Sequence, residues 1–246
     1  MKYFILFFLL SFFLFSQKNI IDNNGFKQGY WELYFPRTDS LVSEKGFFID
    51  DKENGVWTKF HNSGIVREVV NYQNGLIEGV RVVLDKKGKL LEQENYISSQ
   101  LHGVQKYFHD TGKLKMEISC KNGILDGPFM KYYRNGKKQE ISNYKEGLKN
   151  GISFWFFENE SVSMEYPYEN GEINGLAKTY YKDGALKSES TYLNNELNGE
   201  KKEYFPSKKV KLKGVYKDGK KEGKWYSYNE DGSVSKVSRY KNGLEK

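Results

Sequence analysis

The sequence is poor in the residues that build disulfide frameworks and metal or catalytic centres, with one cysteine and three histidines among 246 residues. A single cysteine, Cys120, excludes any disulfide within the chain. No Cys-x-x-Cys or His-Glu-x-x-His spacing is present, so the zinc sites that these motifs mark are not predicted. Proline is also scarce, at four residues, whereas glycine numbers 24 and aromatic residues make up 16%. This balance is typical of many short strands joined by tight turns.

Long hydrophobic runs are absent after residue 16, so no membrane-spanning helix is predicted in the rest of the chain. The N-terminus differs, because Lys2 precedes an almost uninterrupted apolar run from Tyr3 to Phe15. This layout indicates a secretory signal peptide over residues 1–16, cleaved near Ser16, and an uncleaved anchor is the alternative. We therefore expect an exported protein, either periplasmic or secreted. No cysteine lies near the cleavage point, so a lipid-modified cysteine is not available as an anchor.

The main signal is an internal repeat of 24 residues that begins with a glycine. A lead-in over residues 17–28 is followed by a repeat domain over residues 29–246. Its nine repeats start at Gly29, Gly55, Gly79, Gly103, Gly127, Gly151, Gly175, Gly199 and Gly223. The first interval is 26 residues, which indicates two extra residues in the first repeat. With the glycine as position 1, position 6 is aromatic in eight repeats and position 18 is tyrosine in seven.

Turn-forming residues divide each repeat into two segments of strand-forming residues. Position 10 is glycine in six repeats, and Asn-Gly or Asp-Gly occupies positions 20 and 21 in five, as at Asn74-Gly75. Such pairs supply the positive φ angles that two-residue hairpin turns require. Each repeat is therefore predicted to be a β-hairpin in an all-β fold. A lone hairpin buries little apolar surface, so we expect the hairpins to stack on one another.

Residue parity predicts which side chains share a face. Positions 2, 6, 12 and 18 are rich in aromatic and aliphatic residues, and all four numbers are even. Because side chains alternate along a strand and the period is even, these positions are predicted to face one side. Tryptophans at odd positions are then predicted to be exposed, as candidate aromatic anchors for a partner: Trp31, Trp57, Trp155 and Trp225. The alternative is that they cover the second face of the sheet.

The repeat unit resembles the MORN-repeat-variant family. The likeness is plainest from Asp183 to Phe205, DGALKSESTYLNNELNGEKKEYF, and again from Asn135 to Phe157, and it extends over residues 24–246. It implies consecutive β-hairpins stacked into an elongated twisted sheet or solenoid. Proteins with MORN-like repeats are often connected with phospholipids, and bacterial proteins with this variant are often labelled antitoxin components.

Four turn residues depart from the family pattern. Glu160 and Lys208 replace the glycine at position 10, and Ser99 and Asn195 replace the glycine at position 21. Glycine adopts positive φ more readily than these residues do. Different turns are therefore predicted in those repeats.

No residue pattern in the chain points to catalysis. His61 and His109 both stand at position 7, where other repeats carry Tyr or Phe, which favours an ordinary place in the sheet. Cys120 takes the position-18 place of tyrosine, which favours a buried thiol over a nucleophile or metal ligand. No two glycines are spaced two apart, which excludes the Gly-x-Gly fingerprint of dinucleotide binding. We therefore predict no enzymatic activity, no cofactor and no metal site.

Positive charge is concentrated toward the C-terminus. Residues 199–246 hold 13 Lys and one Arg against seven acidic residues, whereas residues 17–198 hold 24 basic and 25 acidic residues. The candidate basic patch consists of Lys201, Lys202, Lys208, Lys209, Lys211, Lys213, Lys220 and Lys221. One interpretation is a solvated terminal cap that keeps the sheet soluble and unpaired. The other is binding to anionic lipid headgroups, lipopolysaccharide-like polyanions or an acidic protein.

These observations predict an exported, non-enzymatic binding or scaffolding protein that presents an extended β surface to a protein partner. Two alternatives stay open, namely binding to an anionic membrane surface through the basic C-terminal repeats and an antitoxin-like inhibitor. Nucleic acid is not expected as a partner of an exported protein. The identity of the partner and the oligomeric state are left open by the sequence.

Overall fold

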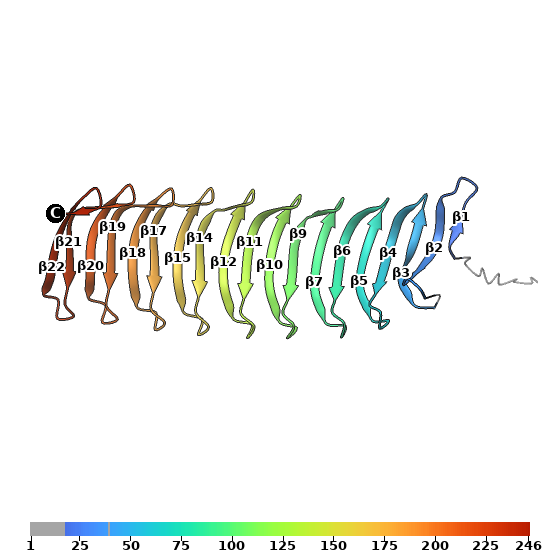
Figure 1. The fold of residues 1–246 in the computed structure, drawn as a ribbon, viewed down its shortest axis with the longest axis horizontal. Helices are drawn as coiled ribbons and strands as arrows, with labels where there is room; N and C mark the ends of the chain where they lie inside the picture. Colours follow the sequence, from blue (N-terminus) through green and yellow to red (C-terminus); the bar gives the residue numbers. More distant parts are fainter. Residues whose placement is uncertain (1–17, 39) are drawn as a thin grey trace, which may run out of the picture.

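A computed structural model describes residues 18–38 and 40–246, which form a single sheet of 23 strands. Each strand pairs antiparallel with a neighbour in the chain, so the sheet grows along one axis as a meander (Figure 1). No helix occurs in these ranges. The prediction of an all-β fold of tandem hairpins in an elongated twisted sheet is confirmed. The predicted signal peptide, residues 1–16, lies outside the described residues.

The strands recur with the period of the sequence. They are β1 (Ile20–Ile21), β2 (Lys27–Tyr34), β3 (Val42–Ile49), β4 (Lys52–Phe60), β5 (Val66–Gln73), β6 (Leu76–Leu84), β7 (Leu90–Ile97), β8 (Gln100–Leu101), β9 (Gly103–Phe108), β10 (Leu114–Lys121), β11 (Ile124–Tyr132), β12 (Lys138–Lys145), β13 (Leu148–Lys149), β14 (Gly151–Phe156), β15 (Val162–Glu169), β16 (Glu172–Ile173), β17 (Gly175–Tyr180), β18 (Leu186–Leu193), β19 (Glu196–Tyr204), β20 (Val210–Lys217), β21 (Lys220–Tyr228), β22 (Val234–Lys241) and β23 (Leu244–Glu245). The extra residues of the first repeat lie in the loop 35–41, which corresponds to 61–65 in the second.

Each hairpin closes at one end in a two-residue turn whose residues both have positive φ. Asn74 and Gly75 have φ angles of 53° and 79°, the pattern of a type I′ turn, which matches the twist of the flanking strands. Ser98 and Ser99 have φ angles of 48° and 62°, and Asn195 has 68°. The prediction of different turns in the repeats that lack this glycine is therefore wrong.

A side-chain hydrogen bond accompanies each of these two replacements. The Oγ atom of Ser99 accepts a hydrogen bond from the backbone N–H of Ile77 at 2.9 Å, and Oδ1 of Asn195 accepts one from Ile173 at 2.7 Å. Both bonds join the turn to the preceding repeat. They offset the strain of a positive φ in a residue with a Cβ atom.

The turns at the other end of the hairpins are also uniform. Gly64 at position 10 has a φ of 80°, and its N–H bonds to the carbonyl three residues earlier. Glu160 and Lys208 occupy the same place with φ angles of 70° and 65°, and each makes the equivalent bond, at 2.8 and 2.9 Å. The prediction of different turns at these two residues is also wrong. The backbone geometry of the repeat overrides the local preference of the side chain.

The two faces of the sheet do not correspond to the even and odd positions of the repeat. In the described residues, every buried residue stands at position 3, 14, 16 or 18. Trp57 at position 3 is 2% exposed, whereas Val56 at position 2 is 58% exposed. We call the face with positions 3, 5, 14, 16 and 18 the covered face, and the face with positions 2, 4, 6, 15 and 17 the open face. The prediction that positions 2, 6, 12 and 18 share one face is wrong.

Two features of each repeat explain why parity fails. Lys59 pairs with Glu68 but the next residue, Phe60, pairs with Val66, which marks a bulge of one residue in the second strand. The two-residue turn pairs Tyr72 at position 18 with Ile77 at position 23, so an even and an odd position share a face. A further register shift surrounds Gly79, whose φ is 83°, but it adds two residues and leaves the faces unchanged. Alternation therefore cannot be counted through the turn or the bulge.

The clearest apolar core lies on the covered face of the first two repeats. Phe48 stands edge-on to both Trp31 and Trp57, with ring centroids 5.7 and 4.8 Å apart, and Val70 completes the cluster. Edge-to-face aromatic pairs contribute about 0.5–1.5 kcal/mol each beyond the area that they bury. Ile77, at position 23, packs against this cluster from the hairpin end.

In two other repeats position 23 is lysine, and its side chain covers the same face. The ammonium group of Lys149 lies 4.5 Å from the ring centroid of Trp155, and that of Lys221 lies 4.5 Å from Trp225 and 4.8 Å from Tyr240. Such cation–π contacts contribute about 0.5–2 kcal/mol each. The covered face is thus closed by residues that the hairpin ends supply.

Two glycines at position 16 make room for two of the tryptophans. A Cβ atom on Gly46 would overlap the indole of Trp57, and one on Gly214 would overlap the indole of Trp225. Neither glycine has a positive φ. Their role is therefore steric, because each leaves space for the indole of the tryptophan in the next repeat.

We expect Gly46→Ala to lower the free energy of unfolding by about 2 kcal/mol, because the added methyl group displaces a buried indole. Urea denaturation measures the loss. In the double variant Gly46→Ala/Trp57→Phe, the smaller ring accepts the methyl group, so the two losses are not additive. Additive losses would contradict the steric role of Gly46.

We expect Glu160→Gly to raise the free energy of unfolding by about 0.5–1 kcal/mol, because glycine adopts the φ of 70° without strain. The ion pair to Lys137, 3.6 Å long and exposed, contributes little. Glu158→Gly, in the same loop without a positive φ, is the control and is expected to be neutral or destabilising. Equal effects from both variants in urea denaturation would refute the strain at Glu160.

Candidate functional site

The residues of catalytic type have structural roles. Nε2 of His61 lies 3.1 Å from the carbonyl oxygen of Leu84 in the next repeat, and Nε2 of His109 makes the same contact with Tyr132. The hydroxyl of Tyr133, also at position 7, donates to a carbonyl of the following repeat at 2.7 Å. Position 7 therefore joins neighbouring repeats, whichever of these side chains is present.

Cys120 is 6% exposed on the covered face. Burial, with a smaller contribution from the charge of Glu94, raises the pKa of its thiol. A protonated, buried thiol is a poor nucleophile and a poor metal ligand. Within residues 18–38 and 40–246, no group of three or more His, Cys, Asp or Glu side chains is placed to hold a metal ion.

A compact charged cluster lies on the covered face around Arg81. Its Nε atom bonds to Glu68 at 2.7 Å, and its Nη1 atom bonds to Glu94 at 2.6 Å and to Glu92 at 3.2 Å. The hydroxyl of Tyr96 also donates to Glu94, at 2.7 Å. One guanidinium thus holds three carboxylates from two strands, β5 and β7, of two repeats.

The protonation states in this cluster are those of a structural ion network. Burial by itself raises the pKa of Glu68, but the hydrogen bond from Arg81 and the charges of Lys59 and Arg81 outweigh it and hold the pKa below its ordinary value. Burial acts on Glu94 in the same way, and the hydrogen bonds from Tyr96 and Arg81 again lower its pKa. Burial and the bond to Glu94 raise the pKa of Tyr96 to about 12. These shifts keep both carboxylates charged, so neither is poised as a general acid.

The predicted aromatic anchors lie on the covered face. Trp31, Trp57 and Trp225 are 9%, 2% and 3% exposed, so the prediction that they are exposed is wrong. Trp155, at position 5, is partly exposed, but Lys149 lies over its ring. Position 3 lies on the covered face because it pairs across the strands with position 16, as Trp57 does with Val70. These indoles cover the second face of the sheet, which is the alternative that the sequence left open.

The eight predicted basic residues do not form one patch. Lys202 and Lys213 are paired across the strands on the open face, whereas Lys201 pairs with Gly214 on the covered face. The others are distributed over the loop after β19, the covered face and the hairpin ends: Lys208, Lys209, Lys211, Lys220 and Lys221. Sequence proximity did not reveal this division, because neighbouring residues of a strand face opposite sides.

A row of exposed aliphatic side chains runs along the open face at position 2. We call it the aliphatic row; its members are 41–58% exposed and consist of Val56, Val80, Val104, Ile152 and Leu176. In the last two repeats Glu200 and Lys224 take this position. The row was not predicted, because residue parity grouped position 2 with position 18, which lies on the covered face.

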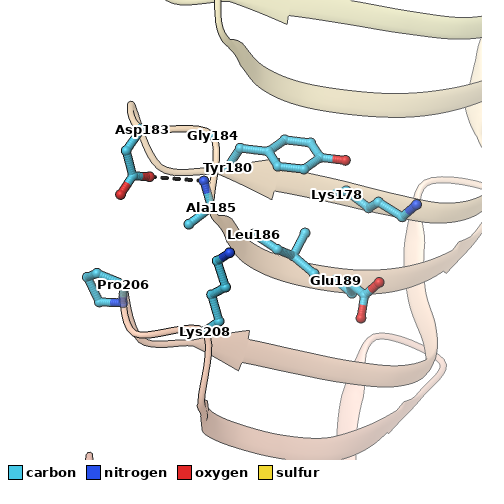
Figure 2. Close-up of a pocket in the computed structure, with 9 residues that line it drawn as sticks. All are labelled: Lys178, Tyr180, Asp183, Gly184, Ala185, Leu186, Glu189, Pro206 and Lys208. Carbon is cyan, nitrogen blue, oxygen red and sulfur yellow. Dashed lines mark hydrogen bonds between the residues drawn. The ribbon is translucent and has the colours of Figure 1, made fainter.

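A groove opens on the open face between the seventh and eighth repeats (Figure 2). Lys178, Tyr180 and Glu189 line it from β17 and β18, and Lys208 reaches toward it from the next loop. Asp183 accepts a hydrogen bond from the N–H of Ala185 at 2.9 Å, which fixes the turn at its rim. The groove therefore combines a phenol with charges of both signs.

One comparison, with the models of known protein families, agrees with this architecture. The pattern of the MORN repeat variant matches residues 53–74, 101–122, 125–146, 173–194, 197–218 and 221–242. The chain belongs to the MORN-repeat-variant family. No curated protein matches it. One similar solved structure is "Crystal structure of GtfA/B complex bound to UDP and GlcNAc", with 14% identity, a TM-score of 0.23, and coverage of 64% of this chain and 29% of that one.

No helix in the described part of the chain is long and apolar enough to cross a membrane. The candidate site consists of the open face, which carries the aliphatic row and, toward its C-terminal end, the groove. The charged cluster around Arg81 belongs to the interior of the sheet.

We expect Arg81→Met to lower the free energy of unfolding by about 3 kcal/mol at about pH 7, because it leaves Glu94 without a cation and Glu68 with Lys59 alone. In the wild type the lowered pKa values of Glu68 and Glu94 stabilise the fold above the ordinary pKa of Glu, and this stability is lost as pH falls. In the variant, both pKa values rise because the guanidinium no longer opposes the effect of burial, so the deficit shrinks toward about pH 5.

Urea denaturation at both pH values checks this dependence on Arg81. Arg134→Met is the control, because Arg134 pairs with Asp110 while both side chains are more than two-thirds exposed, at 69% and 68%. Its loss is expected to be within about 0.5 kcal/mol at either pH. A deficit in Arg81→Met that does not change with pH would refute the ionic role of the cluster.

Proposed function

We propose that the protein is an exported, non-enzymatic scaffold whose open face binds a protein partner. The observation that carries this proposal is the aliphatic row, which presents an exposed Val, Ile or Leu in five of the six hairpins from the second to the seventh repeat. Val56 is 58% exposed at one end of the row, and Leu176 is 45% exposed near the other. Extended exposed apolar surface of this kind marks interaction sites on proteins.

The backbone beneath the aliphatic row is pre-organised. Asn71 pairs across the strands with Val56, and its side-chain amide donates to the carbonyl of Glu78 at 2.9 Å. Asn95 pairs with Val80, and its side chain bonds to the carbonyl of Val104. These amides fill the space between aliphatic side chains and are themselves held by backbone groups. A rigid surface loses less conformational entropy on binding, which favours a scaffold.

The non-enzymatic class is supported by the roles of the potential catalytic groups. The histidines at position 7 bond to backbone carbonyls, Cys120 is buried, and the carboxylates around Arg81 are paired. Export is proposed from the signal-like residues 1–16. We favour a protein partner over an anionic bilayer, because the C-terminal lysines point to several surfaces and not to one plane.

We expect a photo-crosslinking amino acid at Val80 or Ile152, both on the aliphatic row, to capture the same partner in the exported fraction. Leu76 and Leu148 are matched controls at the hairpin ends, since they are 48% and 50% exposed against 47% and 49% for the two test positions. Mass spectrometry of the adducts identifies the partner. No adduct from the row, or equal adducts from the hairpin ends, would refute the proposal.

A further inference from the structure

Charges alternate in sign along one row of the open face in repeats six to eight. The strand register places Glu165 opposite Lys178, Lys178 opposite Glu189, and Glu189 opposite Lys202. Opposite charges that face each other across strands stabilise a sheet. The alternation ends at the next step, where Lys202 faces Lys213. Like charges directly opposite each other are destabilising. Lys202 is compensated by an ion pair with Glu200 at 2.7 Å, whereas Lys213 makes no ion pair with a described residue.

The same glutamates also accept hydrogen bonds from tyrosines of the next repeat. The hydroxyl of Tyr180 donates to Glu165 at 3.0 Å, and that of Tyr204 donates to Glu189 at 2.7 Å. In both cases the tyrosine stands at position 6 and the glutamate at position 15 of the preceding repeat. Burial and these hydrogen bonds raise the pKa of each tyrosine to about 12. A carboxylate is thus part of the open face at both junctions.

The junction between the eighth and ninth repeats has the tyrosine but no carboxylate. Tyr228 stands at position 6, and position 15 of the preceding repeat is Lys213, whose ammonium lies 5.7 Å from the Tyr228 ring centroid. In the part of the chain that the structure describes, the hydroxyl of Tyr228 has no hydrogen-bond partner. A groove there is lined by Lys208, Lys209, Lys213, Tyr228 and Asp231, and we call it the Tyr228 groove.

The acidic residue of the Tyr228 groove is already engaged. Asp231 accepts hydrogen bonds from the backbone N–H and the hydroxyl of Ser233, at 2.7 and 2.5 Å. The lysines at the groove, in contrast, make no ion pair with a described residue. The groove therefore offers several ammonium groups and a free phenol to an anion from outside.

We propose that the Tyr228 groove binds an acidic segment of the protein partner, whose carboxylate takes the place that Glu165 and Glu189 hold at the preceding junctions. The carboxylate accepts the hydrogen bond of Tyr228 and separates the charges of Lys202 and Lys213. This inference rests on the proposed function and adds the chemistry of one contact to it. The favoured partner is a protein, because the aliphatic row, which ends at Leu176 on the same face, suits apolar side chains and the groove suits an acidic one.

The test measures binding of a fluorescent peptide with consecutive glutamates by anisotropy, with the same peptide carrying glutamines as reference. We expect the glutamate peptide to bind at least about tenfold more tightly. Lys213→Glu restores the internal carboxylate, so it reduces binding about tenfold or more. Lys211→Glu is the matched control, because it changes net charge equally but lies against Phe205, outside the groove. We expect it to reduce binding by about twofold.

One further variant and one further measurement distinguish a specific site from general charge attraction. Tyr228→Phe keeps every charge and removes only the hydroxyl, and we expect a loss of about threefold or more in affinity. Lys213→Glu is also expected to raise the thermal midpoint of unfolding, because it restores alternation opposite Lys202 and gives Tyr228 an acceptor. A lowered midpoint, or equal loss of binding in Lys213→Glu and Lys211→Glu, would overturn the proposal.

Anionic vesicles of phosphatidylglycerol provide the last arm. If the vesicles, and not the peptide, show the difference between Lys213→Glu and Lys211→Glu, the groove serves a membrane and the inference is wrong. If the peptide fails to bind while crosslinks from Val80 and Ile152 still capture a partner, only the acidic contact is wrong. Failure of both experiments would remove the scaffold function as well.

Discussion

The structure depends on one backbone constraint, the positive φ of the glycine at position 1 of every repeat. These glycines have φ angles between 71° at Gly223 and 126° at Gly199, a region that other residues rarely adopt. Each lies within or at the start of a strand and not in a hairpin turn. The register shift around Gly79 accommodates two extra residues between Ile77 and Arg81. Positions 23 and 3 therefore both lie on the covered face, and position 23 closes that face.

The interior of the sheet changes character along its length. The N-terminal repeats pack aromatic rings around Trp57, and the C-terminal repeat packs Trp225 between Tyr216 and Tyr240, with ring centroids 5.0 and 6.1 Å away. Between them, Arg81 and its carboxylates occupy the same positions of the covered face. Stability therefore comes from contacts between neighbouring repeats, whose chemistry differs from one junction to the next. The open face can vary independently, because its side chains take no part in these contacts across the interior.

The fold could be predicted from the sequence, but the assignment of side chains to the two faces of the sheet could not. The period of 24 residues, the Asn-Gly turns and the tyrosines at position 18 predicted tandem hairpins, and their family resemblance predicted a stacked sheet. Parity failed because the two-residue turn pairs position 18 with position 23, and the bulge pairs position 5 with position 14, so even and odd positions share a face. Gly46 shows the same limit, since its steric role depends on Trp57 in the next repeat. The candidate lysines were likewise grouped by proximity in the chain, whereas the strand register separates Lys201 from Lys202.

The most direct test of this account is the exposure of the tryptophans in solution. In a Trp155→Phe variant the fluorescence reports Trp31, Trp57 and Trp225, which are 9%, 2% and 3% exposed. Acrylamide should quench these three indoles weakly in the folded protein and strongly after unfolding in urea. Strong quenching in the folded protein would contradict the burial of these indoles on the covered face and would agree with the exposure that residue parity predicts.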